Sequence, residues 1–273
     1  MRLAISGIAW DIDEDEAVAT LLRRHGVDAI DIAPGKYFPD FAQVTAAQAE
    51  DVRACWAARG IEITGMQSLL FGTQGLNLFG DHESRTRMQR HLAAVMRVAG
   101  MLRAPRLVFG SPRNRDRGTL DDDAALAAAV SFLAPLAEVA AREGVLLCLE
   151  PNPARYGCNF MLDAEGTAMV VRALGQPNVR MQFDVGALAI NGEDAGDVLA
   201  RHADIVGHVH ASEPGLVPLG DGGADHAAAA AALRRHLPGA IVCIEMVATA
   251  NEPHLAAIER ALLHAQRCYG AVS

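Results

Sequence analysis

Short, continuous runs of apolar residues alternate with longer amphipathic stretches along the whole chain. The apolar runs have the length and the β-branched content that are typical of buried strands. Strands are apolar on both faces when helices cover both sides of a parallel sheet. The pattern predicts strands at 3–8, 29–33, 61–66, 106–110, 145–150, 179–184, 205–211 and 240–245.

The stretches between these runs carry signals for the beginning and end of helices. Thr45 and Gln48 have the spacing of a capping box, and Gly60 stands where the same helix would end. Asp121 is a suitable N-cap for a long helix that Gly144 would close. We therefore expect strands and helices to alternate through the chain.

Eight alternations in 273 residues give about 34 residues per unit, which is typical of the α/β class and of a (β/α)₈ TIM barrel. The alternative is an open doubly wound sheet, but no G-x-G-x-x-G motif follows the first predicted strand. There is no linker or low-complexity tract apart from an Ala-rich helix at 227–232. The sequence predicts one barrel domain over residues 1–273.

Composition narrows the range of partners and compartments. The net charge is −9 without a dense basic run, so we do not expect nucleic acid as a partner. The five cysteines are odd in number and show no C-x-x-C spacing, which favours reduced thiols in a cytoplasmic protein. We also expect no export signal and no membrane partner, because no apolar run approaches the roughly 20 residues of a membrane span.

Two long connections follow the third and fourth predicted strands, at 68–84 and 110–123. In a barrel enzyme the connections at the carboxyl ends of the strands surround the active site. Both connections contain glycine, and each is a candidate lid or a solvated loop.

The last four predicted strands each end with a residue that can bind a metal. These residues are Glu150, Asp184, His210 and Glu245, separated by 34, 26 and 35 residues. Because this spacing is about one strand–helix unit, a barrel would bring all four side chains to one rim. Their charges would repel one another there without a cation. The pattern therefore predicts a metal site.

The residues two positions earlier share the face of these ligands, one step deeper in the barrel. They are Cys148, Gln182, His208 and Cys243. Small or hydrogen-bonding side chains can orient metal ligands from behind, and we expect His208 to do so.

Three carboxylates and one imidazole form a hard, oxygen-rich ligand set. Such a set suits Mn²⁺ first, with Mg²⁺, Co²⁺ and Zn²⁺ as alternatives. A structural zinc site held by thiolates is not indicated.

The segments LEPN, FDVGA, HVHASE and IEMV, placed on eight strand–helix units, resemble the xylose-isomerase-like TIM-barrel sugar phosphate isomerase/epimerase superfamily. That superfamily includes ketose 3-epimerases and inosose isomerases and dehydratases. The resemblance implies a divalent metal held by Glu150, Asp184, His210 and Glu245, with Glu150 and Glu245 as the proton-transfer pair. It also implies an isomerase or epimerase of a sugar, sugar phosphate or related polyhydroxy ketone that acts through a cis-enediolate.

The chain departs from the ketohexose 3-epimerases at three positions that grip sugar hydroxyls in that group. It has Tyr156, Ala187 and Leu216 where the group has glutamate, histidine and arginine. Because of this departure, the main alternative to an isomerase or epimerase is a dehydratase that uses the same metal site and acts on an inosose-like keto-polyol. A DNA-repair endonuclease is disfavoured by the acidic net charge, and a non-catalytic metal or sugar binder stays open.

Other polar or aromatic residues near the predicted strand ends could contact the substrate. Two arginines after the fourth strand could hold a phosphate or carboxylate. A small polyhydroxy molecule is the expected partner, and a homo-oligomer is compatible with this type of barrel. The candidate substrate contacts are Trp10, Gln67, Ser111, Arg113, Arg115, Asn152, Asn159 and Glu213.

Overall fold

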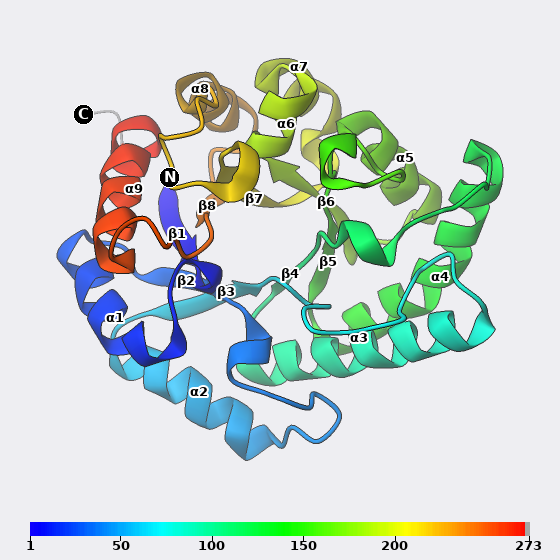
Figure 1. Cartoon of the computed structure of the whole chain (residues 1–273), viewed down its shortest axis with the longest axis horizontal. Helices are drawn as coiled ribbons and strands as arrows, with labels where there is room; N and C mark the ends of the chain where they lie inside the picture. The colour runs from blue at the N-terminus through cyan, green and yellow to red at the C-terminus, as the bar shows by residue number, and fades with distance from the viewer. Residues whose placement is uncertain (271–273) are drawn as a thin grey trace.

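Eight parallel strands close into a barrel in the computed structural model, which describes residues 1–270 (Figure 1). Each strand pairs with its neighbours in sequence, and β1 pairs with β8 to close the ring. The predicted (β/α)₈ barrel is therefore confirmed. The strands are β1 (Arg2–Ser6), β2 (Ala29–Ile32), β3 (Glu62–Met66), β4 (Arg106–Phe109), β5 (Leu146–Leu149), β6 (Val179–Asp184), β7 (Val206–Ser212) and β8 (Ile241–Glu245).

The helices form a layer around the strands (Figure 1). They cover the outer face of the barrel, so the strands are buried almost throughout and need apolar residues on both faces. The helices are α1 (Asp15–Arg24), α2 (Ala46–Ala58), α3 (His82–Leu102), α4 (Asp122–Glu143), α5 (Ala164–Leu174), α6 (Val185–Asn191), α7 (Ala195–His202), α8 (His226–His236) and α9 (His254–Tyr269).

Each predicted strand is present, with bounds that differ by two residues at most. The largest difference is at β1, where the sequence predicts a strand to Ile8 but the strand ends at Ser6. The chain turns there into a short 3-10 helix, and Oγ of Ser6 accepts a hydrogen bond from the backbone N–H of Ile8 at 3.3 Å. A side chain that bonds the backbone two residues on competes with strand pairing.

The predicted helix caps are also present. Thr45 and Gln48 form the expected capping box at the start of α2. Oδ1 of Asp121 accepts a hydrogen bond from the backbone N–H of Ala124 at 2.8 Å and so caps α4. Gly144 ends α4 in the left-handed conformation that favours glycine.

One helix corrects the expectation that no segment approaches the length of a membrane span. α4 has 22 residues, and an 18-residue window within it has a mean hydropathy of 1.8. By length and composition alone this helix could cross a membrane. Its buried residues, which include Phe132, Leu133 and Leu136, belong to the hydrophobic core of the barrel. A helix that packs on a barrel can pass the same test, so a single such helix among residues 1–270 is weak evidence for a span.

The strands all run in the same direction, so their carboxyl ends form one mouth. The connections that follow β3 and β4 contact each other beside it. The backbone N–H of Leu78 donates to the carbonyl oxygen of Asn114 at 2.8 Å, and the side-chain amide of Asn114 donates to the carbonyl oxygen of Leu76 at 2.7 Å. The first connection ends earlier than predicted, because Asp81 caps α3 and the helix begins at His82.

Candidate metal centre at the mouth of the barrel

Four side chains from the last four strands meet at the mouth. Glu150 directly follows β5, Asp184 and Glu245 are the last residues of β6 and β8, and His210 lies in β7. Nδ1 of His210 is 3.2 Å from Oε1 of Glu150 and 3.2 Å from Oε2 of Glu245. It is 3.8 Å from Oδ2 of Asp184. One donor atom of each residue lies within 4.8 Å of the others, so the structure brings together the four predicted ligands.

The position of Asp184 follows from its contacts with the start of α6. Its Oδ1 accepts a hydrogen bond from the backbone N–H of Ala187 at 2.6 Å, which makes it the N-cap of that helix. Oγ of Ser212 lies 2.9 and 3.0 Å from the two carboxylate oxygens and accepts a hydrogen bond from Gly186 at 2.9 Å. Sequence reasoning missed Ser212, although it lies two residues after His210 on the same face of β7.

Two amide side chains hold the two glutamates. Nε2 of Gln67 donates to Oε1 of Glu245 at 2.9 Å, and Nδ2 of Asn152 donates to Oε2 of Glu150 at 3.2 Å. Both amides are buried, and both are among the predicted substrate contacts. In each glutamate the other oxygen is the one that faces His210. Each carboxylate therefore has one oxygen held by an amide and one directed at the centre.

The crowded charges change the pKa values of the centre. Burial, followed by the negative charges of Glu150 and Glu245, raises the pKa of Asp184 well above its ordinary value. Burial lowers the pKa of His210, but the carboxylates of Glu245 and Glu150 outweigh this effect and raise the pKa well above its ordinary value. Burial raises the pKa of Glu245, but the charge of His210 and several hydrogen bonds bring it below the ordinary value. Both upward shifts favour the protonated forms of Asp184 and His210, which reduce the net negative charge of the centre.

The donor set fits a divalent cation. Oε1 of Glu150 and both ring nitrogens of His210 are buried and lack a hydrogen bond of good geometry within the described residues. Buried polar atoms without partners raise the free energy of the fold, and an ion at the centre would provide partners. Three carboxylates and an imidazole suit Mn²⁺, Mg²⁺, Zn²⁺ or Co²⁺, and the arrangement does not distinguish among them.

The two predicted anion-binding arginines have different surroundings. Arg115 is fully buried, and its Nη1 donates to the backbone carbonyl oxygen of Glu150 at 2.7 Å. Burial lowers the pKa of Arg115 from its ordinary value. Arg113 is exposed, and Oγ of nearby Ser111 donates to Oδ1 of Asn114 at 2.5 Å. Arg115 thus holds the end of β5, whereas Arg113 is open to solvent.

Two further candidates contact other protein groups. Trp10 is buried, its Nε1 donates to Asp15 at 2.7 Å, and its ring packs edge-on against Trp56 at 6.3 Å. Nδ2 of Asn159 donates to Oδ1 of Asp116 at 2.6 Å, which ties together the segments after β5 and β4. Contact of either residue with a substrate stays a prediction.

Glu213 is buried and makes several contacts with its own loop. Its carboxylate accepts hydrogen bonds from the backbone N–H groups of Gly220 at 2.7 Å and Ala224 at 2.9 Å. Nε2 of His226 lies 3.1 Å from the same carboxylate. These partners occupy both oxygens, so the geometry supports a loop-fixing role for Glu213 more directly than a substrate contact.

His208 lies beside a residue that sequence reasoning missed. Its Nε2 is 2.5 Å from Oδ2 of Asp31, which lies in β2 and is fully buried. The sequence holds a weaker signal for Asp31, because an acid within an apolar strand needs a buried partner, although it does not lie at the strand end as the predicted ligands do. Asp31 lay outside the last four strands and was therefore not compared with them.

Tyr156, Ala187 and Leu216 are the positions at which the sequence is expected to depart from the ketohexose 3-epimerases. The Tyr156 hydroxyl accepts a hydrogen bond from the backbone N–H of Gly215 at 2.7 Å, which links the segments after β5 and β7. Ala187 is buried in the first turn of α6, and Leu216 follows in the segment after β7. Recognition of a substrate would therefore rest on other residues.

Comparison with known proteins agrees with the barrel. A family model described as xylose isomerase-like TIM barrel matches residues 19–267. A search of curated proteins found no match. A solved D-psicose 3-epimerase in the presence of D-fructose has 18% identity and a TM-score of 0.81, covering 99% of this chain and 100% of that chain.

Two other solved structures are similar. The apo form of 3-keto-D-glucoside 4-epimerase, YcjR, from E. coli has 18% identity and a TM-score of 0.80, covering 98% of this chain and 100% of that chain. An IOLI protein with a binding zinc atom has 16% identity and a TM-score of 0.76, covering 98% of both chains. At these identities the likeness shows a shared fold, while function depends on the site.

Proposed function

Because this chain belongs to the xylose isomerase-like TIM barrel family, we propose that it is a divalent-metal-dependent isomerase or epimerase. Its substrate would be a sugar, a sugar phosphate or a related polyhydroxy ketone, converted through a cis-enediolate. The observation that carries the proposal is the convergence of donor atoms from Glu150, Asp184, His210 and Glu245 within 4.8 Å. Structural similarity to sugar epimerases supports it at the level of the fold.

In this proposal the four converging residues hold one divalent ion, with Mn²⁺ as the first expectation. When bound, such an ion supplies Lewis-acid chemistry that stabilises the negative charge formed when a carbon-bound proton leaves. The side chain of His210 is fully buried and those of the three acids are largely buried. Water is thus mostly excluded from the ligands, which strengthens their electrostatic interactions.

Glu150 and Glu245 are the proposed proton carriers. Each has one oxygen facing the centre and one oxygen held by the amide of Asn152 or Gln67. The two glutamates come from β5 and β8, which lie three strands apart in the ring, so they approach a bound substrate from different sides. Removal of a proton by one glutamate and delivery by the other inverts a stereocentre. Delivery to the neighbouring carbon shifts the carbonyl group instead.

Glu150→Gln and Glu245→Gln test the assignment. Each variant is incubated with Mn²⁺ and a panel of sugars, sugar phosphates, inososes and keto acids in D₂O, and NMR follows deuterium incorporation. Loss of one proton carrier is expected to reduce exchange by about 10²-fold or more. Glu138→Gln, at an exposed position on α4, serves as the control for the loss of a carboxylate.

Full exchange in either glutamine variant would contradict the acid–base assignment. The same spectra identify the reaction class. An epimer or a shifted carbonyl supports the proposal, whereas a new enone or deoxy-ketone would replace it with the dehydratase alternative. A compound of the panel that stabilises the protein but is not converted would indicate a protein that binds its ligand without catalysis.

We further propose that residues 1–273 act as one domain on a small molecule in the cytoplasm. All five cysteines are free thiols, which supports a reducing compartment. Sedimentation of the purified protein would determine whether it pairs into a homo-oligomer.

A further inference from the structure

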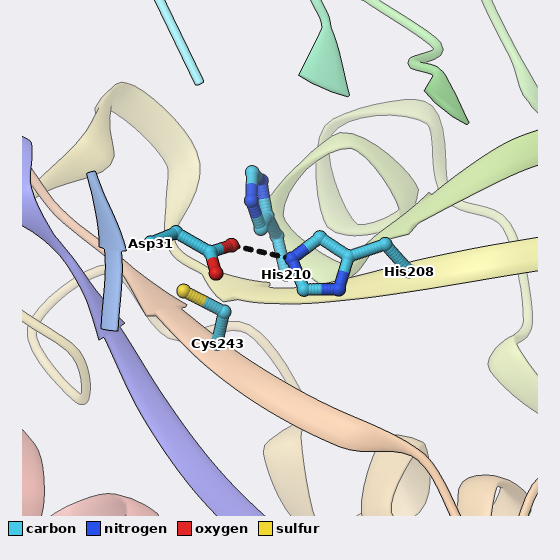
Figure 2. A group of neighbouring side chains, drawn as sticks. All are labelled: Asp31, His208, His210 and Cys243. Atoms are coloured by element: carbon cyan, nitrogen blue, oxygen red, sulfur yellow. Dashed lines mark hydrogen bonds and ion pairs between the residues drawn. The ribbon is translucent and has the colours of Figure 1, made fainter. Parts of the chain in front are cut away.

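A second buried cluster lies beside the candidate metal centre. It consists of Asp31 from β2, His208 and His210 from β7, and Cys243 from β8. One donor atom of each lies within 4.8 Å of the others. Figure 2 shows the carboxylate of Asp31 directed at the ring of His208, with the sulfur of Cys243 beside it and the ring of His210 behind. All four are at most 2% exposed. His210 belongs both to this cluster and to the metal centre.

The carboxylate of Asp31 is fixed from several directions. Its Oδ2 is 2.5 Å from Nε2 of His208, and its Oδ1 accepts a hydrogen bond from Oγ1 of Thr64 at 2.9 Å. It also packs against Gly65, where a β-carbon would lie only 2.6 to 2.8 Å from the carboxylate atoms. The charge of Asp31 therefore has a defined position below the centre.

The cluster fits a hydrogen-bonded network better than a second metal site. Two ligands of one zinc ion lie about 3.3 Å apart when bonds of about 2.0 Å meet at tetrahedral angles. The 2.5 Å separation of Asp31 and His208 is much shorter and is a hydrogen-bond distance. These two residues are therefore partners of each other.

The rings of His208 and His210 each have a nitrogen without a hydrogen-bond partner among the described residues. These atoms are Nδ1 of His208 and Nε2 of His210, and both are buried. The other nitrogen of His210, Nδ1, faces the three acids of the centre. If Nδ1 binds an ion, the imidazole must carry its proton on Nε2, and a nearby carboxylate favours that proton.

We propose that Asp31 is a positioning residue of the metal centre, which orients His208 by a direct hydrogen bond and, through its charge within 4.8 Å, favours the form of His210 that carries its proton on Nε2. This inference rests on the proposed function, because it assumes that Nδ1 of His210 binds an ion. The carboxylate of Asp31 bonds the ring of His208 and is not one of the four groups that would hold the ion. Directing Nδ1 at the centre lowers the cost of arranging the ligand when the ion binds.

Co²⁺ binding tests the proposal without requiring a substrate. The native chain and Asp31→Asn are titrated with Co²⁺, followed by visible absorption and calorimetry. Asn keeps the shape of the side chain but removes its charge, so we expect Co²⁺ binding to weaken about 10- to 100-fold. Thr64→Val keeps the carboxylate but removes one of its donors, and it should weaken binding about threefold. This milder variant provides the test if Asp31→Asn does not fold.

Glu165→Gln is the matched control. It removes another carboxylate–histidine pair, because Oε2 of Glu165 lies 3.2 Å from Nε2 of His202 between α5 and α7. Its Co²⁺ affinity should equal that of the native chain. In Zn²⁺-loaded native protein, ¹H–¹⁵N spectra of the histidine rings should show the His210 proton on Nε2.

Each contrary outcome has a distinct meaning. Unchanged Co²⁺ affinity in Asp31→Asn and Thr64→Val would overturn the role of Asp31 and leave the metal centre standing. A proton on Nδ1 of His210 in the loaded protein would contradict the assignment of that nitrogen as a metal ligand. Two Co²⁺ ions per chain, with a thiolate absorption band that disappears in Cys243→Ala, would replace the network with a second ion site. A native chain that binds no Co²⁺ would contradict the proposed metal centre itself.

Discussion

The carboxylate of Glu150 packs directly against Gly110, the residue that follows β4. A β-carbon at Gly110 would lie 1.8 Å from Oε2 and 2.8 Å from Cδ of the glutamate. No pair of heavy atoms tolerates such contact without a bond, so the glutamate has room only because position 110 lacks a side chain. The position of Glu150, which follows β5, thus depends on the glycine that follows the neighbouring strand β4.

Gly110→Ala should displace Glu150 from the centre. We expect Co²⁺ affinity to fall by at least about tenfold and isomerase activity to fall with it, because a shift of about 1 Å in a catalytic group is costly. Calorimetry measures the first effect and substrate turnover the second. Gly35→Ala is the control, since a β-carbon there would meet no atom within 4 Å. Native Co²⁺ affinity in a folded Gly110→Ala protein would contradict the packing argument.

Ion binding should release protons. The pKa values of Asp184 and His210 are both raised above their ordinary values, so both groups keep their protons to higher pH than usual when no ion is bound. An incoming cation must displace these protons, and its apparent affinity should therefore rise with pH, by up to about tenfold per unit for each proton released. Calorimetric titrations in buffers with different ionisation enthalpies count the protons directly. Affinity that does not change between pH 6 and pH 8 would contradict the expectation.

Glu213→Gln should destabilise the fold at neutral pH. The variant loses the charge that His226 and the loop amides stabilise, and we expect a loss of about 2 kcal/mol in the free energy of unfolding. Burial raises the pKa of Glu213, but hydrogen bonds from His226, Ala224 and Gly220 bring it below the ordinary value. Its stabilising contribution is thus full above about pH 4.3 and disappears as pH falls through the folded pKa.

Urea unfolding of the native chain and of Glu213→Gln at several pH values provides the measurement. The difference in unfolding free energy should shrink below about pH 4, where the native glutamate takes up a proton. Glu138→Gln, which changes an exposed acid, should stay within about 0.5 kcal/mol of native stability throughout. A difference that stays constant down to low pH would show that charge is not the cause.

Thr45→Ala should cost about 1 kcal/mol of unfolding free energy. The variant removes the side-chain oxygen that accepts a hydrogen bond from the backbone N–H of Gln48 at 3.3 Å. Thermal unfolding measures the change. Thr119→Ala, at an exposed turn position, is the comparison, and equal stability of the two variants would argue against a contribution from the capping box.

Much of the fold could be predicted because the barrel imposes a regular pattern. Strands buried on both faces need continuous apolar runs, and runs such as 179–184 match β6 residue for residue. The ends of strands and helices could be predicted less accurately where one side-chain hydrogen bond determines them. Ser6 ends β1 two residues early, and Asp81 starts α3 inside a predicted loop.

The candidate site could be predicted in part for a related reason. Four ligand-type residues at corresponding strand ends form a signal that repeats, and repetition separates it from chance. Asp31 and Ser212 occur once each, so only the folded chain shows that they contact His208 and Asp184. The burial of Arg115 was equally hidden, because it depends on how the segment after β4 folds over the end of β5.

Closure of the ring by β1 and β8 affects when an ion can be acquired. A growing polypeptide on the ribosome exposes Glu150 and Asp184 long before Glu245 has left the exit tunnel. The β-strand that carries Glu245 is also the one that must pair with β1, so the four ligands come together only when β8 closes the ring. Any ion that these residues hold would then bind after the ring has closed. The metal supply of the compartment in which the chain folds would decide which metal these four residues bind.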